Sequence, residues 1–336
     1  MEVFLPTHSK TFDRIGLNRD TQPMPAKKRM AMRILAVIAL MAAFGFIGRV
    51  CYKNWERLEN LTVHFDLAFV ALSVFLLSAA IFSAGWGWFI ILRSVGINAP
   101  YRLVQYNWFL SNLGKYIPGK IWTISSRVYL HSAHNHSAKQ VVSASLLEAI
   151  FSYTVAVLVV LILAVYLGKL NVYLGPLALI FFLGCLFLSP RLFSKALNLG
   201  LSLIKKGDIQ ITLDIVSRLK IAFVYLGAFI FWGLAFSFFV KSLFPVAPSE
   251  FAYFTLSFVF SSLAGMLAFF VPKGVGVRES MLVLMLSPVI GEPAALVAAI
   301  SSRLWIVLTE AFLMFLSYLA FKPKAGKAPA LEKETA

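Results

Sequence analysis

Long runs of apolar residues cover most of the chain, and lysine, arginine, proline and glycine collect in the short segments between them. Several runs reach the ~20 residues that an α-helix needs to cross ~30 Å of hydrocarbon. Membrane-spanning helices are predicted at residues 31–51, 66–92, 139–167, 171–189, 220–244, 251–271, 275–290 and 294–321. Residues 101–131 are apolar only in patches, which predicts a broken or re-entrant segment. The pattern predicts an all-α polytopic membrane protein with about eight transmembrane helices plus this segment.

The distribution of positive charge predicts the orientation. Lysine and arginine collect in residues 1–29, 190–220 and 322–336, and short segments of this kind remain on the cytoplasmic side of a membrane. We expect residues 1–29 and 322–336 to be cytoplasmic tails on either side of one transmembrane domain, residues 30–321. The broken segment must then enter and leave the membrane by the same face.

Composition supports this interpretation. The chain is 60% hydrophobic and 14% charged, with a mean hydropathy of +0.81, whereas soluble domains carry roughly 25% charged residues. A net charge of +16 does not indicate nucleic-acid binding here, because the basic residues flank apolar runs instead of forming a soluble basic domain. A cationic cytoplasmic face would instead attract anionic lipid headgroups.

A first candidate site lies in the broken segment. Proline interrupts a helix and glycine permits close approach of a ligand, and irregular backbone at membrane depth survives only inside protein or beside a wet cavity. The candidate binding residues are Lys115, Tyr116, Pro118, Gly119, Lys120 and Arg127. The alternative is an ordinary cytoplasmic turn with solvated lysines.

A second segment repeats this combination between two later apolar runs. Its candidate binding residues are Pro272, Lys273, Gly274, Gly276, Arg278 and Glu279. The segment has no Walker pattern, so nucleotide binding is not expected. A broken helix whose amides and cations face an anionic headgroup is the functional interpretation, and a tight positive loop at the cytoplasmic surface is the alternative.

Charged residues within predicted spans form the third candidate group, which consists of Glu148, Arg303 and Glu310. A charge at mid-bilayer costs at least ~2.5–3.5 kcal/mol unless it is paired or hydrated. We expect Glu148 to pair with Arg303, either as part of the site or as a purely structural ion pair. Pro118 precedes Glu148 by 30 positions and Pro272 precedes Arg303 by 31, which suggests an internal repeat of the kind that transporters contain.

Three histidines lie close together at His131, His134 and His136. Their spacing fits no single helical face, and neither cysteine nor carboxylate is adjacent, so we expect no metal site. We also find no reactive constellation for catalysis, and therefore expect neither enzymatic activity nor a cofactor.

The motifs resemble those of a known family. The segment from Gly114 to Lys120, followed by Ser145-Leu146-Leu147-Glu148, is similar to the first-half motifs of the lysylphosphatidylglycerol synthase transmembrane family, also called flippase-like. The segment from Pro272 to Glu279 resembles its second-half Pro-x-Gly-x-Gly-x-Arg-Glu element, although Lys273 stands where a small or apolar residue is usual. The resemblance extends over residues 31–321.

The resemblance implies a bacterial inner-membrane domain that moves or presents a lipid between leaflets. Family members handle aminoacylated phospholipid or lie near glycolipid and envelope-polysaccharide enzymes. Because the chain ends at Ala336 without a soluble aminoacyl-transfer domain, we do not expect it to synthesise lysyl-lipid. We expect a flippase for an anionic phospholipid, glycolipid or polyprenyl-phosphate-linked lipid. The alternative is a non-transporting lipid-binding or scaffold partner of an envelope glycosyltransferase.

Overall fold

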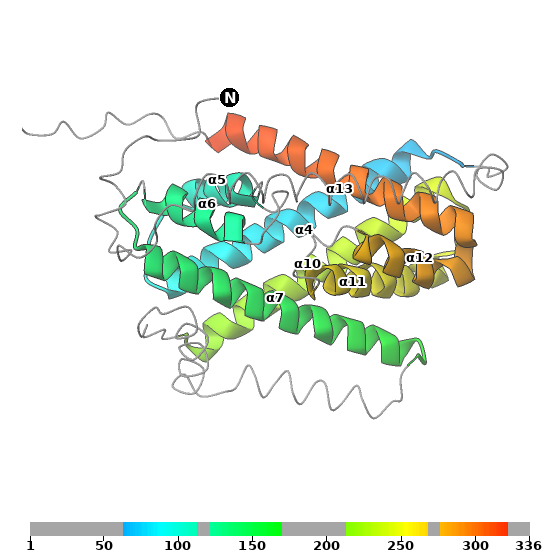
Figure 1. The fold of residues 1–336 in the computed structure, drawn as a ribbon, viewed down its shortest axis with the longest axis horizontal. Coiled ribbons are helices and arrows are strands. Elements are labelled where there is room, and N and C mark those ends of the chain that lie inside the picture. The colour runs from blue at the N-terminus through cyan, green and yellow to red at the C-terminus, as the bar shows by residue number, and fades with distance from the viewer. Residues whose placement is uncertain are drawn as a thin grey trace, which may run out of the picture.

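A computed structural model describes residues 63–112, 114, 121–132, 134–169, 213–267 and 276–321, and these are helical apart from short connections (Figure 1). The predicted spans 31–51 and 171–189 lie outside the described residues, as do the two tails. Within the described residues, five helices are long and apolar enough to cross a membrane. They are α4 (Leu67–Ser94), α7 (Ala138–Tyr166), α10 (Ile215–Leu243), α11 (Phe251–Leu267, preceded by the 3-10 turn η2, Pro248–Glu250) and α13 (Glu292–Phe321).

Three shorter helices complete the described part of the fold: α5 (Tyr101–Asn112), α6 (Ile121–Ser132) and α12 (Val277–Ile290). At 1.5 Å per residue, the 12 residues of α5 or α6 extend only about 18 Å, well short of a ~30 Å hydrocarbon core. The two helices pack against each other at one end of the molecule (Figure 1). This arrangement agrees with the predicted re-entrant segment.

The predicted span 275–290 is found as α12 to within two residues, but it is too short to cross a ~30 Å hydrocarbon core. Gly276 adopts a φ of +87°, which an L-residue with a side chain rarely adopts, and α12 begins only after it. The resulting helix of 14 residues is about 21 Å long. It packs against α11 as α6 packs against α5.

The described helices form two similar halves, α4–α7 and α10–α13. Their lengths match in order, with 28 and 29 residues in the first helices, 12 and 17 in the second, 12 and 14 in the third, and 29 and 30 in the fourth. The internal repeat suggested by the sequence is therefore present in the helices.

The two halves run in opposite directions. The backbone N–H groups of His64 and Asp66, at the start of α4, donate to the carbonyls of Leu243 and Ser242, at the end of α10, both at 3.0 Å. Further along, the Ser83 hydroxyl in α4 donates to the Val224 carbonyl near the start of α10, at 3.0 Å. The corresponding first helices are thus antiparallel, which is the relation found in inverted-topology repeats of transporters.

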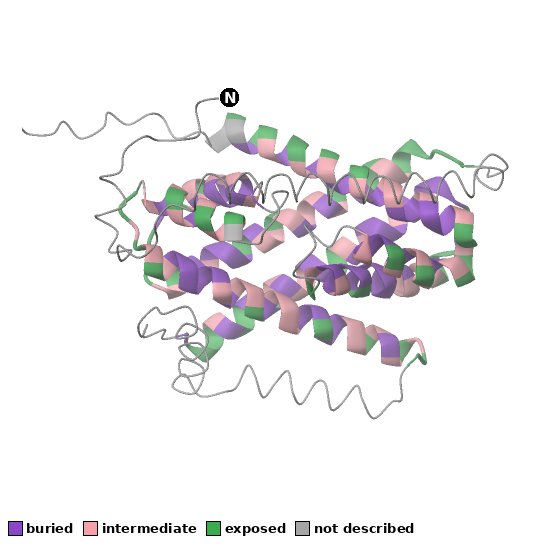
Figure 2. Cartoon of the chain, in the orientation of Figure 1, coloured by how far each residue is buried: buried purple, intermediate pink, exposed green. Residues whose placement is uncertain are grey.

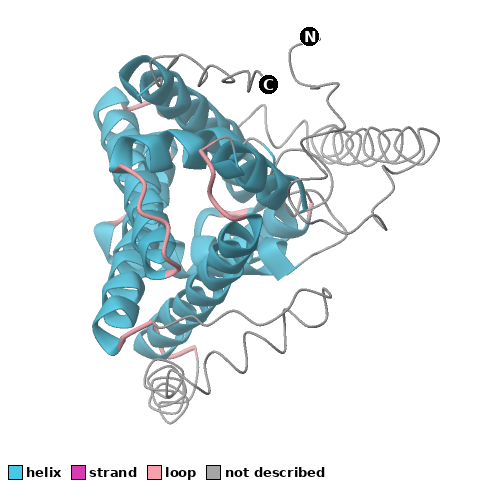
Figure 3. Cartoon of the chain, turned by 90° about the vertical axis from the view of Figure 1, so that its left-hand side faces the viewer, coloured by secondary structure: helices cyan, strands magenta, loops and turns pink. Residues whose placement is uncertain are grey.

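The halves also exchange partners. Helix α7 of the first half packs on α11 of the second, and α13 of the second packs on α5 of the first. Seen from the α5–α6 end, the helices form one bundle (Figure 3). Buried positions face the interior and exposed positions face outward (Figure 2), and the outward positions include large apolar side chains such as Phe75, Phe223 and Leu284, as a lipid-facing surface requires.

Glycines at matching positions permit the close packing within each half. A Cβ at Gly85 of α4 would lie 2.4 Å from the amide of Gln105 in α5, and a Cβ at Gly233 of α10 would lie 2.2 Å from a methyl carbon of Thr255 in α11. Both glycines are the nineteenth residue of their helix. Small residues at such crossings let membrane helices approach each other closely.

We predict that Gly233→Ala destabilises the protein, because the short, branched Thr255 side chain cannot swing aside as the longer Gln105 can. An overpacked contact of this kind costs about 1–3 kcal/mol. The matched control is Gly227→Ala in the same helix, where an added Cβ meets nothing within 4 Å. The apparent Tm in detergent should fall for Gly233→Ala and stay unchanged or rise for Gly227→Ala, and equal changes would contradict this account of the packing.

Candidate functional site

An ion pair joins α6 and α7 in the first half. Arg127 is buried, and one of its guanidinium nitrogens pairs with Glu148 Oε2. The indole N–H of Trp108, from α5, donates to Glu148 Oε1 at 3.2 Å. The Arg127 guanidinium also lies over the ring of Trp88, 4.1 Å from its centre, an arrangement that stabilises a desolvated cation. Both charges are therefore compensated at membrane depth, as burial requires.

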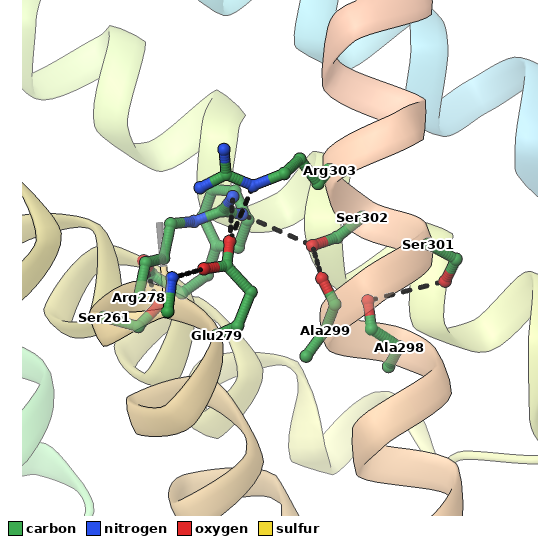
Figure 4. A network of polar contacts seen from close by, with 10 residues as sticks. Ser261, Arg278, Glu279, Ala298, Ala299, Ser301, Ser302 and Arg303 are labelled. Atoms are coloured by element: carbon green, nitrogen blue, oxygen red, sulfur yellow. Dashed lines mark hydrogen bonds and ion pairs between the residues drawn. The ribbon is translucent and has the colours of Figure 1, made fainter. Parts of the chain in front are cut away.

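A second charged cluster joins α12 and α13 in the other half (Figure 4). Arg303 Nε donates to Glu279 Oε1 at 2.8 Å, and the Gly276 backbone N–H donates to Glu279 Oε2 at 2.7 Å. Arg278 approaches the same carboxylate at 3.8 Å and donates to the Ser302 hydroxyl at 3.4 Å. The carboxylate thus fixes the first turn of α12 against the middle of α13.

The expected pairing of Glu148 with Arg303 is wrong. Each of the two residues pairs within its own half, Glu148 with Arg127 and Arg303 with Glu279. The reason lies in the short helices α6 and α12. Each short helix packs against the long helix that follows it, so its charge meets the long helix's charge at the same depth.

A cavity of about 530 Å³ lies between the two halves. Its walls come from α4, α5, α6 and α7 on one side and from α10, α11 and α13 on the other. Most lining side chains are apolar or aromatic. The charged residues that line it, within the described part of the chain, are Arg127, Glu148 and Glu310. The first ion pair thus faces a space large enough for a small polar group, since ligand pockets measure roughly 300–1,000 Å³.

The predicted site residues separate into three groups. Arg127, Glu148 and Glu310 meet at the cavity. Arg278, Glu279 and Arg303 form the second cluster and do not line the cavity, while Gly276 supplies the backbone N–H that holds Glu279. The remaining predicted residues lie outside the described residues, and they are Lys115, Tyr116, Pro118, Gly119, Lys120, Pro272, Lys273 and Gly274.

Several cavity residues were not predicted. Asn112, Tyr153, Tyr225 and Trp232 line the cavity, together with Trp108. The sequence shows many aromatic residues within spans, and interfacial belts account for most such residues in membrane proteins. In the sequence, the one signal for this part of the cavity wall is the polar character of α5, which differs from the long apolar helices around it.

The histidines form a compact group at the end of α6. His131 is buried, and its Nδ1 lies 3.3 Å from Nδ1 of His136. Burial, and to a lesser extent His134, lowers the pKa of His136 in the connecting loop. Within the described ranges, no group of three or more histidine, cysteine or acidic residues is placed to hold a metal ion.

The two ion pairs yield a direct test by double-mutant cycles. We expect Arg127→Gln and Glu148→Gln each to lower the apparent Tm, because removing one partner leaves a buried charge uncompensated. The double variant should recover part of that loss, with a coupling energy of about 0.5–3 kcal/mol.

The cycle of Glu148→Gln with Arg303→Gln is the matched control. The two residues belong to different pairs, so their effects should add within about 0.5 kcal/mol. A larger coupling for Glu148 with Arg303 than for Glu148 with Arg127 would contradict the observed pairing.

Comparison with known proteins agrees with this architecture. The family described as lysylphosphatidylglycerol synthase TM region matches residues 33–313. Among curated proteins, none matches the chain. The family match covers both halves, both ion pairs and all the residues that line the cavity except Met314. The chain therefore belongs to the lysylphosphatidylglycerol synthase transmembrane family, a membrane domain linked to lipid handling or flipping.

Proposed function

We propose that this protein moves a phosphate-bearing lipid between the two leaflets of the membrane. Anionic phospholipids, glycolipids and polyprenyl-phosphate-linked lipids all present the required headgroup chemistry. The observation that carries the proposal is the cavity of about 530 Å³ between two oppositely oriented halves, with an arginine in its wall. Cavities at the interface of inverted repeats are where transporters bind their substrates.

The cavity suits a headgroup better than a complete lipid. Its volume falls within the roughly 300–1,000 Å³ of small-molecule sites. A headgroup in this space would be removed from the hydrocarbon, and the walls supply polar contacts from Arg127, Asn112 and Glu310. The hydrocarbon chains would remain outside, in an apolar environment, so the protein needs to shield only the polar part of the lipid.

Arg127 is the residue that we expect to bind the phosphate. A guanidinium presents a planar fork of donors that matches phosphate as well as carboxylate. Glu148 pairs with one nitrogen of this fork, and Arg127 Nε has no hydrogen-bond partner among the described residues, so an entering phosphate would find one free donor and compete with Glu148 for the other. Trp108 already donates to Glu148 and would retain the displaced carboxylate.

We infer transport because a cavity between two inverted halves is the arrangement in which transporters bind their substrates. A scaffold that carries no lipid would be expected to have a packed interior with Glu148 and Arg303 held together. The cavity and the separate ion pairs favour movement of a lipid over that alternative.

Leaflet transfer in reconstituted liposomes tests the proposal. We expect the wild-type protein to accelerate transfer of at least one labelled phosphate-bearing lipid, and the double variant Arg127→Gln/Glu148→Gln to be slower by about tenfold or more. That factor corresponds to the loss of one charge-assisted contact of about 1.5–3 kcal/mol. The double variant removes both charges together, so neither remains buried alone.

Arg93→Gln is the control for the loss of one positive charge. Arg93 is an exposed cation at the end of α4, away from the cavity lining, so its replacement should leave transfer unchanged. A folded wild-type protein that transfers none of the three lipid classes would refute the proposed function. Equal losses for Arg93→Gln and the double variant would remove Arg127 and Glu148 as the site.

A further inference from the structure

A second, smaller cavity adjoins the central one. It measures about 160 Å³ and lies between α5 and α13, where it is lined by Tyr106, Phe109, Leu110, Met314, Phe315 and Ser317. Phe109 and Met314 line both cavities. The cavity between α5 and α13 therefore shares a wall with the chamber that holds Arg127 and Glu148.

The smaller cavity reaches from the protein interior to the lipid-facing surface. Ser317 is 3% exposed, whereas Phe315 in the same wall is 58% exposed. The lining is otherwise aromatic and aliphatic, and the Ser317 hydroxyl has no hydrogen-bond partner among the described residues. Such a lining suits hydrocarbon and offers little to a polar ligand. Its open side faces the position where lipid chains lie.

The charges at the two ends of the bundle place this groove in one leaflet. One end carries basic residues: Arg93 at the end of α4, Arg102 at the start of α5 and Lys139 at the start of α7. A hydrogen bond from the Gln140 side-chain amide to the Val95 carbonyl joins the end of α4 to the start of α7. Asp66, Glu250 and Glu292 lie at helix starts of the opposite end. The basic end corresponds to the cytoplasmic side.

Helix α13 runs toward this basic end. Its Trp305 stacks on Phe239, with ring centres 4.8 Å apart. Phe239 lies near the end of α10, at the acidic end of the bundle. Its later residues Met314 and Ser317 face α5, and its last turns lie beside α5 and α6 (Figure 1). The groove is therefore in the half of the membrane next to the cytoplasm.

The equivalent seam of the inverted repeat lies between α7 and α11. There Val155 and Val159 of α7 belong to the same buried core as Val259 and Leu263 of α11. All four side chains are buried. Phe109 of α5 and Leu313 of α13 belong to this core as well, and the cavity of about 160 Å³ lies beside them.

We propose that the groove between α5 and α13 is a lateral portal that holds a hydrocarbon chain of the carried lipid in the cytoplasmic leaflet. The headgroup then lies in the central cavity near Arg127, and the chain leaves it through the seam between α5 and α13. This inference rests on the proposed function and adds the chain subsite and the leaflet from which the site is open.

Photocrosslinking of the full-length protein in nanodiscs tests the portal. The probe is a phosphatidylglycerol with a diazirine midway along one acyl chain, and the modified residues are mapped by mass spectrometry. We expect adducts on Phe109, Met314 and Ser317. Lipid at the outer surface cannot account for an adduct on Ser317, because that side chain is buried.

Ser317→Trp fills the groove, and Leu319→Trp is its matched control. Leu319 is two positions away in the same helix and is 63% exposed, so an added indole there meets lipid. We expect Ser317→Trp to reduce adducts on Phe109 and Met314 at least fivefold and to slow leaflet transfer about tenfold. Leu319→Trp should change neither. Ser317→Leu, a smaller change, should give an intermediate reduction if the tryptophan variant does not fold.

The outcomes separate the portal from the proposed function. Adducts confined to exposed positions such as Phe315 and Leu308 overturn the portal, and adducts on Val259 or Leu263 overturn its assignment to α5 and α13. Rapid transfer without groove adducts leaves the function standing and removes the portal. In a last outcome, the wild-type protein gives groove adducts that Ser317→Trp abolishes, but it transfers no lipid. That result would support the chain subsite and refute transport.

Discussion

Charge compensation inside a low-dielectric bilayer is the constraint on which the rest of this structure depends. A single buried arginine or glutamate would cost several kcal/mol at mid-membrane, and both halves meet that cost in the same way. A short helix that does not cross the membrane brings one charge to the depth of its partner on the following long helix. The short helices α6 and α12 thus carry the charges that compensate those of α7 and α13.

The inverted relation of the halves converts these local pairs into a cavity wall. Antiparallel α4 and α10 form the common support, and the exchange of α7 and α13 between halves closes the bundle around it. Neither half can enclose the cavity alone, since its lining comes from both. The two ion pairs also differ in accessibility. Arg127 and Glu148 face the cavity, while Glu279 and Arg303 fasten α12 to α13 beside it.

The sequence predicted the helices better than their partners. Run length identified the described spans, and glycine identified the start of α12, where Gly276 adopts a φ of +87°. Pro118 and Pro272 lie outside the described residues. The choice between Arg127 and Arg303 as partner of Glu148 depends on which helices pack together, and hydropathy contains no such information. The opposite directions of α4 and α10 follow from the predicted spans and orientation, but the contact between these two helices does not. Tyr225 and Trp232 at the cavity resemble any other aromatic residue in a span.

The ion pairs of the two halves have opposite polarity. The short helix contributes the arginine in the first half and the glutamate in the second. For halves related by inversion across the membrane plane, this exchange of sign cancels the reversal of direction. If each short helix moved along the normal relative to its long helix, by motions related by the same inversion, the two halves would therefore displace charge in the same direction. A transmembrane voltage acts on every charge that moves along the normal, and here it acts on both halves in the same sense.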